Sequence, residues 1–544
     1  MNVHLLYPDR DLRLDEPTKD EAQALVQDLA LEPLFRTMAQ EDGLIGNVVR
    51  SVLLAHGTAD LSVIRFRQEA LSDCLAHGDI VLDLYQCAGE GLESVRQLGI
   101  LGFYSRSPSS MLYSGLKVLG ALIPTLKHLR MMAASAYPRF RSRAFRNLFE
   151  TIESELDDVF FGEVESHRRE LEFRDGVLMS AVLGAANKGT NYELKQSGVR
   201  HPIWASRLFR PTRDALSFSV APRDEAGHRA LEALRDRALH PVAHALLQSN
   251  DHMMAFLTAL RTELAFYLGC THLHGQLVDQ GLTVCFPVAL PPDRRTHACS
   301  GLFDLSLVLG GVDGRVCGND LDIVDRWIIL VTGANRGGKT TFLRALGQAQ
   351  LMMQAGMFVP AASFTANVSD GIFTHFKRRE DASMERGKLD EELQRLSAVV
   401  TRLRRNSLLI MNESFASTHE VEGSELALQI LSALAPLRVK IVFVTHLYTF
   451  ARMWYEAGRE DTWFLRAERL SDGTRTFRMI TGEPFDTSFG EDVYRRVFSP
   501  PEGDDTRLDA SALPCAVEEG RKAAEAREGR EAREGREEQE GGDP

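Results

Sequence analysis

One stretch constrains the fold of this 544-residue chain more than any other: RWIILVTGANRGGKTTFLRAL, residues 326–346. Its first apolar run predicts a buried strand, its last part predicts a helix, and the segment between fits the pattern GxxxxGK[ST]. In that pattern glycines let backbone N–H groups surround phosphates, the lysine reaches the outer phosphates and the hydroxyl ligates Mg²⁺. The predicted nucleotide-binding residues are Gly333, Ala334, Asn335, Arg336, Gly337, Gly338, Lys339, Thr340 and Thr341.

The rest of the chain divides into a helical part and an alternating part. Up to residue 275, apolar residues recur at three- and four-residue spacing, which predicts helices, including one long amphipathic stretch at 143–173. Glycine, proline and aromatic residues interrupt this pattern at 184–223, where we expect a small clamp-like insertion. From 276 to 500, short apolar runs alternate with helical stretches, which predicts an α/β domain with a mainly parallel sheet.

Two further segments carry predictions, one inside the second part and one after it. The apolar run LFDLSLVLG, residues 302–310, is expected to be a strand. The last segment, 501–544, has no aromatic residue and carries 14 acidic and 7 basic side chains, so we expect a disordered acidic tail.

Composition narrows the class of protein. With 44% hydrophobic and 26% charged residues, the chain has the composition of a soluble globular protein, and no apolar run reaches the ~18 residues of a membrane helix. The N-terminus does not resemble a signal peptide, and seven scattered cysteines without a CxxC pair predict neither disulfides nor zinc. We therefore expect a cytoplasmic protein without membrane contact. A net charge of -13 does not itself indicate a nucleic-acid binder. It does not exclude one, because binding needs a local basic face and not a basic average.

The phosphate loop and the segments after it resemble the ATPase domain of the MutS DNA mismatch-repair family. GANRGGKTT resembles the family's GPNMGGKST, and GMFVPA resembles its next landmark, G-x-x-VPA. In order along the chain, IFTH resembles IFTR, LLIMNES resembles LVLMDE, VTHLYTFA resembles ATHY, and TGEPFDTSFG resembles the G-x-x-x-x-SYG motif. The resemblance covers residues 319–493 and implies a multidomain fold, with a helical core and lever region followed by an α/β P-loop ATPase domain.

Two residues are candidates for catalysis. Glu413 directly follows a buried apolar run, where a carboxylate can polarise the water that attacks the terminal phosphate. The alternative is a salt-bridged surface glutamate. His446 follows the run VKIVFV, at the position that senses the terminal phosphate in the family. The alternative for His446 is a polar cap at a strand end.

The resemblance also implies a homodimer formed through the ATPase domains. In the family, each subunit completes its partner's site through a Ser-Thr motif. Carry-over without a gap puts Gly387 and Lys388 at that motif, so Lys388 is the candidate for a contact in trans. The alternative is an exposed lysine near a helix start.

Asn412 is the main departure from the family. The usual aspartate orders Mg²⁺ through water ligands, whereas asparagine keeps an oxygen acceptor and loses a full charge. We expect ATP and Mg²⁺ as cofactors, Thr340 and Asn412 on the metal side, and a weakened affinity for Mg²⁺. Val316 stands where the family often has an aromatic residue that stacks on adenine, so the residues predict phosphate binding more firmly than a preference for ATP.

The functional hypothesis is an ATP-binding and ATP-hydrolysing DNA clamp or sensor in mismatch repair or recombination, acting on duplex or branched DNA. Because the helical pattern begins close to Met1, the family's mismatch-recognition and connector domains are expected to be absent. The candidate DNA contacts in the insertion are Arg200, Arg207, Arg210 and Arg213, with a solvated face as their alternative. The alternative function is a nucleotide-dependent switch that binds a protein partner, with slow hydrolysis and no DNA role. An ABC-type ATPase is disfavoured, because no LSGGQ-like sequence precedes LLIMNES.

Overall fold

The computed structural model describes most of the chain. The described residues are 1–14, 19–99, 107–173, 177–185, 189–195, 219–311, 316–378, 387–470 and 474–485. Helices dominate the first part of these residues and two sheets organise the second, so the expected combination of a helical part and a mainly parallel sheet is confirmed. Met1–Ser488 form one compact unit. The boundaries at 275 and 500 stay predictions, and the predicted tail lies outside the described residues.

A chain of helices builds the first part. These are α1 (Lys19–Asp28), α2 (Glu32–Ala39), α3 (Gly43–Leu54), α4 (Leu61–Ala76), α5 (Gly78–Gln97), α6 (Pro108–Ala136), α7 (Arg143–Glu155), α8 (Asp158–Leu171) and α10 (Glu225–Asp279). The single helix predicted at 143–173 is wrong, because α7 and α8 are separate helices. The Asp157 side chain accepts a hydrogen bond from the Phe160 N–H and caps α8. A capping residue needs non-helical backbone, so this aspartate ends the helical run before it.

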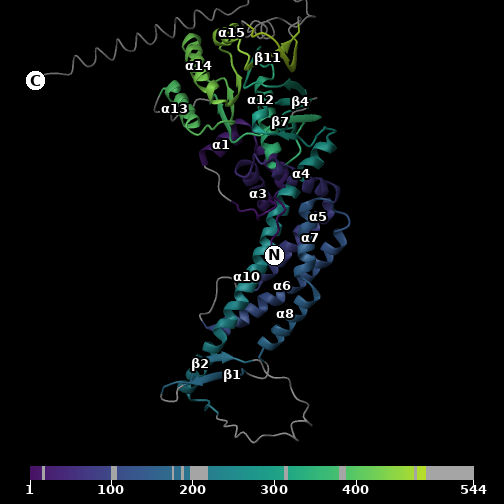
Figure 1. Ribbon diagram of the computed structural model, residues 1–544, viewed down its shortest axis with the longest axis vertical. Coiled ribbons are helices and arrows are strands. Elements are labelled where there is room, and N and C mark those ends of the chain that lie inside the picture. Colours follow the sequence, from purple (N-terminus) through teal and green to yellow (C-terminus); the bar gives the residue numbers. More distant parts are fainter. Residues whose placement is uncertain are drawn as a thin grey trace, which may run out of the picture. The chain divides into compact units, whose positions relative to one another are not determined.

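The helix α10 is the longest described helix, with 55 residues, and it runs through Pro241. It packs along α5 and α6 and also contacts α2, α3 and α4 (Figure 1). Before it, β1 (Met179–Leu183) and β2 (Gly189–Leu194) pair as an antiparallel hairpin that the sequence did not predict. Most of the insertion expected at 184–223 lies outside the described residues.

The larger sheet carries the phosphate loop. Its strands are β6 (Ile328–Thr332), β8 (Ile372–Phe376), β9 (Leu408–Asn412), β10 (Lys440–Val444), β11 (Thr462–Arg469) and β12 (Arg475–Thr481). The order is β12-β11-β6-β10-β9-β8, and β12 pairs antiparallel while the other neighbours are parallel. Every residue of β6, β9 and β10 is buried, as expected for strands covered on both faces.

The register of this sheet sets where the site forms. Val444 pairs with Val331 on one side and with Asn412 on the other, so the carboxyl ends of β6, β10 and β9 are level. The helices α12 (Lys339–Ala355), α13 (Lys388–Val400), α14 (Glu420–Leu434) and α15 (Tyr448–Glu456) lie between the strands in sequence. Residues that follow level parallel strands gather at one edge of the sheet, which is where ligands bind in such folds.

A second sheet has four short strands in the order β3-β7-β4-β5. The strands are β3 (Val288–Leu290), β4 (His297–Leu302), β5 (Asn319–Ile323) and β7 (Ser363–Asn367), with the 3₁₀ turns η2 (Pro292–Arg294) and η3 (Ala435–Leu437) elsewhere in this part. The strand predicted at 302–310 is wrong, because most of that run forms the helix α11 (Leu305–Leu309). The Asp304 carboxylate accepts from the Ser306 N–H and starts the helix, although the apolar run by itself suits a strand.

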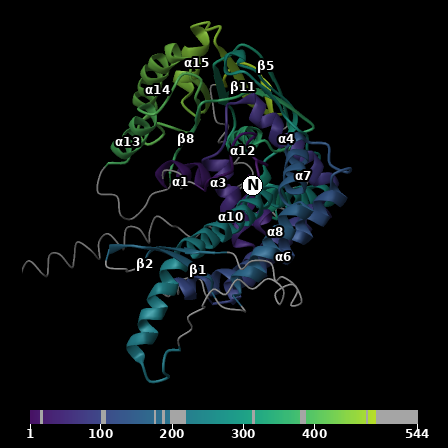
Figure 2. The same cartoon turned by 60° about the horizontal axis from the view of Figure 1, so that its bottom comes forward.

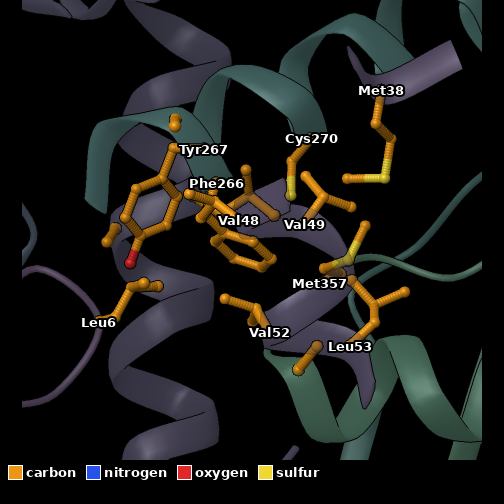
Figure 3. Packing of buried hydrophobic residues seen from close by; sticks show 14 of the residues in the cluster. Leu6, Met38, Val48, Val49, Val52, Leu53, Phe266, Tyr267, Cys270 and Met357 are labelled. Carbon is orange, nitrogen blue, oxygen red and sulfur yellow. The ribbon is translucent and has the colours of Figure 1, made fainter. Parts of the chain in front are cut away.

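One buried apolar cluster connects the helical part to the helix that follows the phosphate loop. Figure 3 shows Leu6 of the N-terminal segment, Val48 and Val52 of α3, Phe266 of α10 and Met357 beyond α12 within this cluster. These side chains are almost fully buried, and burying a side chain of this kind stabilises a fold by about 1.5–3 kcal/mol. In both views α12 lies next to α3 and α4, with which it makes contact (Figures 1 and 2).

Arg67 of α4 is fully buried and reaches the far end of α12. Its Nε donates to the Leu6 carbonyl at 2.9 Å, and its Nη1 donates to the carbonyls of His56 at 3.0 Å and Ala355 at 3.3 Å. The guanidinium lies 4.5 Å from the centroid of the Tyr7 ring. Because Ala355 is the last residue of α12, Arg67 satisfies a carbonyl that the helix itself leaves unpaired. One side chain therefore joins the N-terminal segment, α4 and α12.

Lys440, at the start of β10, is buried among uncharged acceptors. Its Nζ donates to the Asn367 Oδ1 at 2.8 Å and the Thr296 carbonyl at 3.1 Å, and it lies 3.2 Å from the Nδ1 of His297. Burial lowers the pKa of Lys440 to about 7, and burial together with Lys440 lowers the pKa of His297 well below its usual range.

We expect this lysine to make stability depend on pH. Between the folded pKa of about 7 and the ordinary value of 10.5, the unfolded chain binds a proton that the folded chain lacks, so stability rises with pH. Below pH 7 the amine is protonated in both states and its burial cost is fully present. Relative to Lys440→Met, the wild type should gain up to about 1.4 kcal/mol of unfolding free energy per pH unit across this window. Urea unfolding of both proteins at a series of pH values measures the difference, and a constant difference contradicts the prediction.

None of the helices among the described residues is long and apolar enough to cross a membrane.

Candidate nucleotide site

The loop 333–338 between β6 and α12 has the backbone of a phosphate-binding loop. Gly333 and Gly338 have φ values of 120° and 87°, and Arg336 between them has a φ of 61°. A Cβ on Gly333 would lie 2.8 Å from the backbone nitrogen of Ala467 on β11, so the loop passes too close to that strand for any side chain there. The loop ends at the first turn of α12, whose free N–H groups favour an anion.

Lys339 is folded back onto this loop. Its Nζ donates to the carbonyls of Gly333 and Ala334, both at 2.9 Å, and the side chain is almost fully buried. Burial lowers the pKa of Lys339 to about 8; the carboxylate of Glu413 raises that pKa and the guanidinium of Arg475 lowers it further. The ammonium therefore occupies the mouth of the loop, bound by two neutral carbonyls that a phosphate can outcompete.

Thr340 and Asn412 place two side-chain oxygens, both possible metal ligands, next to each other. The Thr340 hydroxyl donates to the Asn412 Oδ1 at 3.3 Å, which joins the start of α12 to the end of β9. Both oxygens are hard ligands of the kind that Mg²⁺ prefers, so these residues fit a magnesium ion. Neither carries a charge, and the described residues contain no group of three or more His, Cys, Asp or Glu side chains that could hold a metal. A magnesium ion here would depend largely on the phosphates and on water for its ligands.

Glu413 and His446 face each other across the ends of β9 and β10. The Glu413 Oε1 lies 3.3 Å from the His446 Nε2, and the His446 Nδ1 lies 3.1 Å from the Tyr448 hydroxyl. A neutral His446 that carries its proton on Nε2 satisfies both contacts. The hydrogen bond from His446 lowers the pKa of Glu413; burial opposes this, and the charges of Lys339 and Lys377 add to the lowering. Glu413 is therefore ionised at neutral pH and able to orient a water.

Lys339, Thr340, Glu413 and His446 line one cavity of about 460 Å³, whereas Asn412 is not among its lining residues. Besides the loop residues 335–341, its lining consists of Leu307, Val316, Cys317, Asn319, Glu413, His446 and Phe477. The polar groups thus lie together with an apolar set, as in sites that hold a charged group and a flat apolar group of one ligand. The volume falls within the usual range of about 300–1,000 Å³ for small-molecule sites.

The sequence interpretation missed three residues near the site. Phe477 of β12 is half exposed beside the cavity with a φ of 61°. Asn319 holds that strand in place, because its side chain donates to the Phe477 carbonyl at 3.4 Å and accepts from the Met479 N–H at 2.7 Å. Lys377 follows β8, and its N–H donates to the Asn412 carbonyl at 3.0 Å. No sequence motif includes these three residues. Each lies near the site only because it pairs with a segment that is distant in the sequence.

Other predicted residues lie elsewhere. Lys388 is the first residue of α13 and does not line the nucleotide cavity of its own chain. The four candidate DNA contacts, Arg200, Arg207, Arg210 and Arg213, lie outside the described residues.

Comparison with known protein families agrees with this geometry. The family described as MutS2 N-terminal domain matches residues 59–280, and the family described as MutS domain V matches residues 329–502. This chain belongs to the MutS family. The first match includes α10 and most of the helical part, and the second includes the phosphate loop, β9 and β10 of the chain.

Individual relatives resemble about a third of this MutS-family chain. It is 27% identical over 176 residues to the DNA mismatch repair protein MutS of Clostridium botulinum, covering 32% of this chain and 19% of that protein. It is 31% identical over 175 residues to the endonuclease MutS2 of Lacticaseibacillus paracasei, covering 31% and 22%. The DNA mismatch repair protein MutS of Thermus aquaticus is 26% identical over 175 residues, covering 32% and 21%. The chain therefore spans 19% to 22% of the length of these curated relatives.

Proposed function

We propose that this chain binds ATP together with Mg²⁺ and hydrolyses it, and that it uses the cycle to act as a clamp or sensor on DNA. The observation that carries the hydrolysis proposal is the convergence of Lys339, Thr340, Glu413 and His446 on one cavity. Transfer of a phosphoryl group to water needs charge neutralisation, a metal and an oriented water. Lys339 and the loop amides supply the first, Thr340 and Asn412 would hold the metal, and the ionised Glu413 orients the water.

Within this proposal, His446 keeps Glu413 in position. Its Nε2 faces the carboxylate and its Nδ1 faces Tyr448, so the ring bridges the end of β9 and the start of α15. A terminal phosphate in the cavity would approach the same ring. The metal would supply charge stabilisation on the phosphate oxygens.

DNA binding in mismatch repair or recombination is the second part of the proposal. The family membership supports it, and two of the relatives are DNA mismatch repair proteins by name. The test is ATP turnover by the full chain, alone and with duplex, mismatched and branched DNA, alongside DNA binding at increasing salt. We expect binding that weakens steeply with salt, because phosphate contacts release counterions. Absence of binding to every DNA form at low salt with ATP present overturns this part.

Asn412 favours the second candidate function, a slow nucleotide-dependent switch that binds a protein partner. Asparagine at this position has one negative charge less than aspartate, which lowers the affinity for Mg²⁺. A lower Mg²⁺ affinity is expected to slow hydrolysis. This candidate predicts tight nucleotide binding, turnover that DNA does not stimulate, and no salt-dependent DNA binding. The same panel of measurements therefore separates the two functions.

We expect Asn412→Asp to strengthen the coupling between Mg²⁺ and nucleotide. The added carboxylate replaces a neutral oxygen beside Thr340 without a change of size, so the concentration of Mg²⁺ for half-maximal nucleotide affinity should fall by about tenfold, or about 1.4 kcal/mol. Titration of Mg²⁺ against fluorescent nucleotide binding measures the shift. If nucleotide binding depends on Mg²⁺ in the same way in both proteins, Asn412 does not lie on the metal side.

We further propose a homodimer in which Lys388 of one chain approaches the nucleotide of the other. Its position at the start of α13, away from its own chain's cavity, supports this arrangement. Lys388→Met should then lower turnover only in the dimer, and mixing it with a Glu413→Gln chain should restore part of the activity.

A further inference from the structure

The turn that carries Glu413 has an unfavourable backbone. Glu413 and Phe415 have φ values of 53° and 67°, both in the left-handed region that residues with a side chain rarely adopt. Such a conformation persists only where the surrounding structure holds it. Ser414 and Phe415 are fully buried, so groups inside the protein must supply that support. The position of the Glu413 carboxylate in the nucleotide cavity therefore depends on these groups.

Two backbone hydrogen bonds hold the start of the turn. The Glu413 N–H donates to the Val444 carbonyl at 2.8 Å, which extends the pairing of β9 with β10 by one residue. The Ala416 N–H donates to the Glu413 carbonyl at 3.3 Å. The N–H of Phe415 takes part in neither bond, so the second left-handed residue needs another partner.

Glu392 of α13 supplies that partner. Its Oε1 accepts a hydrogen bond from the Phe415 N–H at 2.6 Å, and the residue is only 3% exposed. Its other oxygen, Oε2, is buried and accepts no hydrogen bond from any described residue. Burial lowers the pKa of Arg395, and Glu392 is among the groups that raise it, so the two opposite charges lie close together. The short hydrogen bond to the turn is thus the main polar contact of this carboxylate, and such bonds to carboxylates are strong.

His375 of β8 forms a second support beside Glu392. The His375 Nδ1 lies 2.7 Å from the Ser414 Oγ, and the His375 Nε2 lies 3.2 Å from the Glu392 carbonyl oxygen. Burial, together with Arg395, lowers the pKa of His375 to about 4, so the ring is neutral near neutral pH. A ring with its proton on Nε2 satisfies both contacts, because Nδ1 then accepts from the serine hydroxyl. The turn is therefore tied to α13 both directly and through this histidine.

We propose that Glu392 is a positioning residue for the hydrolysis of ATP, because its carboxylate holds the turn that aims Glu413 at the attacking water. This inference rests on the proposed hydrolysis. Glu392 does not line the nucleotide cavity, so it acts through Glu413 and not on the nucleotide. A misplacement of about 1 Å at a reacting group can lower a rate by about 100-fold. A buried acceptor with a purely structural role would instead change stability without a specific effect on the chemical step.

Single-turnover hydrolysis and fluorescent nucleotide binding, both with the full chain, separate these two roles. We expect Glu392→Leu, which has no acceptor, to lower the single-turnover rate by roughly 10- to 100-fold and to leave nucleotide affinity within about twofold. Glu392→Gln keeps one oxygen at the same reach and should recover most of the rate. Glu391→Gln is the matched control, because Glu391 is an exposed neighbour on α13 that does not line the nucleotide cavity.

A double variant shows whether Glu392 acts through Glu413. In the Glu413→Gln chain the group to be positioned is already lost, so adding Glu392→Leu should change the remaining rate by less than about twofold. Losses that multiply in the double variant overturn the proposal. A full rate in Glu392→Leu, equal losses of rate and nucleotide affinity, or no recovery by Glu392→Gln also overturn it.

Hydrogen–deuterium exchange of the nucleotide-free chain keeps this inference separate from the proposed function. The Phe415 amide should exchange at least about tenfold faster in Glu392→Leu than in the wild type and in Glu391→Gln, because its acceptor is gone. If this difference appears but the wild type hydrolyses no ATP, the proposed function fails while Glu392 still holds the turn. Equal exchange in the three proteins overturns the inference even where hydrolysis is found. Circular dichroism melting confirms that each variant is folded.

Discussion

Replacing Glu413 by glutamine is expected to lower ATP turnover by roughly 10²- to 10⁴-fold, the usual contribution of a positioned acid–base group. Glutamine keeps the size of the side chain and one oxygen, but it cannot accept a proton from water. The lowered pKa of Glu413 means that the native carboxylate is already ionised at neutral pH. Nucleotide affinity should stay the same or rise slightly, because the variant removes a negative charge near the phosphates.

Single-turnover hydrolysis and fluorescent nucleotide binding measure the two effects separately. Glu425→Gln is the matched control, since Glu425 is an exposed glutamate of α14 that does not line the cavity. Full turnover by the Glu413→Gln protein would falsify the proposed role. Equal loss of binding and turnover would instead assign Glu413 to holding the loop.

Arg67→Met should destabilise the compact unit by about 3 kcal/mol. The variant removes the hydrogen-bond donor of the carbonyls of Leu6, His56 and Ala355. Each buried carbonyl left without a hydrogen bond lowers the free energy of unfolding by roughly 1–3 kcal/mol. Relief from burying the guanidinium offsets part of that sum. The stacking on the Tyr7 ring is also lost.

Urea unfolding, followed by circular dichroism, gives the change in midpoint. Arg65→Met is the control two residues earlier on α4, where the arginine is exposed and the effect should stay within about 0.5 kcal/mol. A midpoint for Arg67→Met equal to that of Arg65→Met would show that water or a shifted side chain satisfies the three carbonyls.

Local patterns predicted the elements that carry the chemistry, because these elements are determined by local sequence. The runs WIILV, LLIMN and KIVFV are buried strands flanked by polar residues, and the structure contains them as β6, β9 and β10. The boundary at Asp157 and the helix α11 were missed for one reason. In both places a single aspartate caps a helix, and one hydrogen bond outweighs the apolar periodicity around it.

The parts of the site that come from distant pairing were not predictable from the sequence. Phe477 lines the cavity because β12 pairs with β11, and Asn319 of β5 fixes the backbone around it. Lys377 approaches Glu413 because β8 pairs with β9. The identity of these residues carries no signal until the register of the strands is known.

The two attachments of α12 have a consequence for how the chain responds to nucleotide. Its first turn follows the phosphate loop, and its last carbonyl is held by Arg67, 17 residues or about 25 Å along the axis. A helix resists compression, because its backbone hydrogen bonds run along that axis. Nucleotide that orders the loop should therefore slow the hydrogen–deuterium exchange of backbone amides in α3 and α4, although no residue of these helices lines the nucleotide cavity. The amides that exchange more slowly with bound nucleotide should therefore extend from the loop along α12. In a variant that lacks Arg67, only the amides of the loop should be protected.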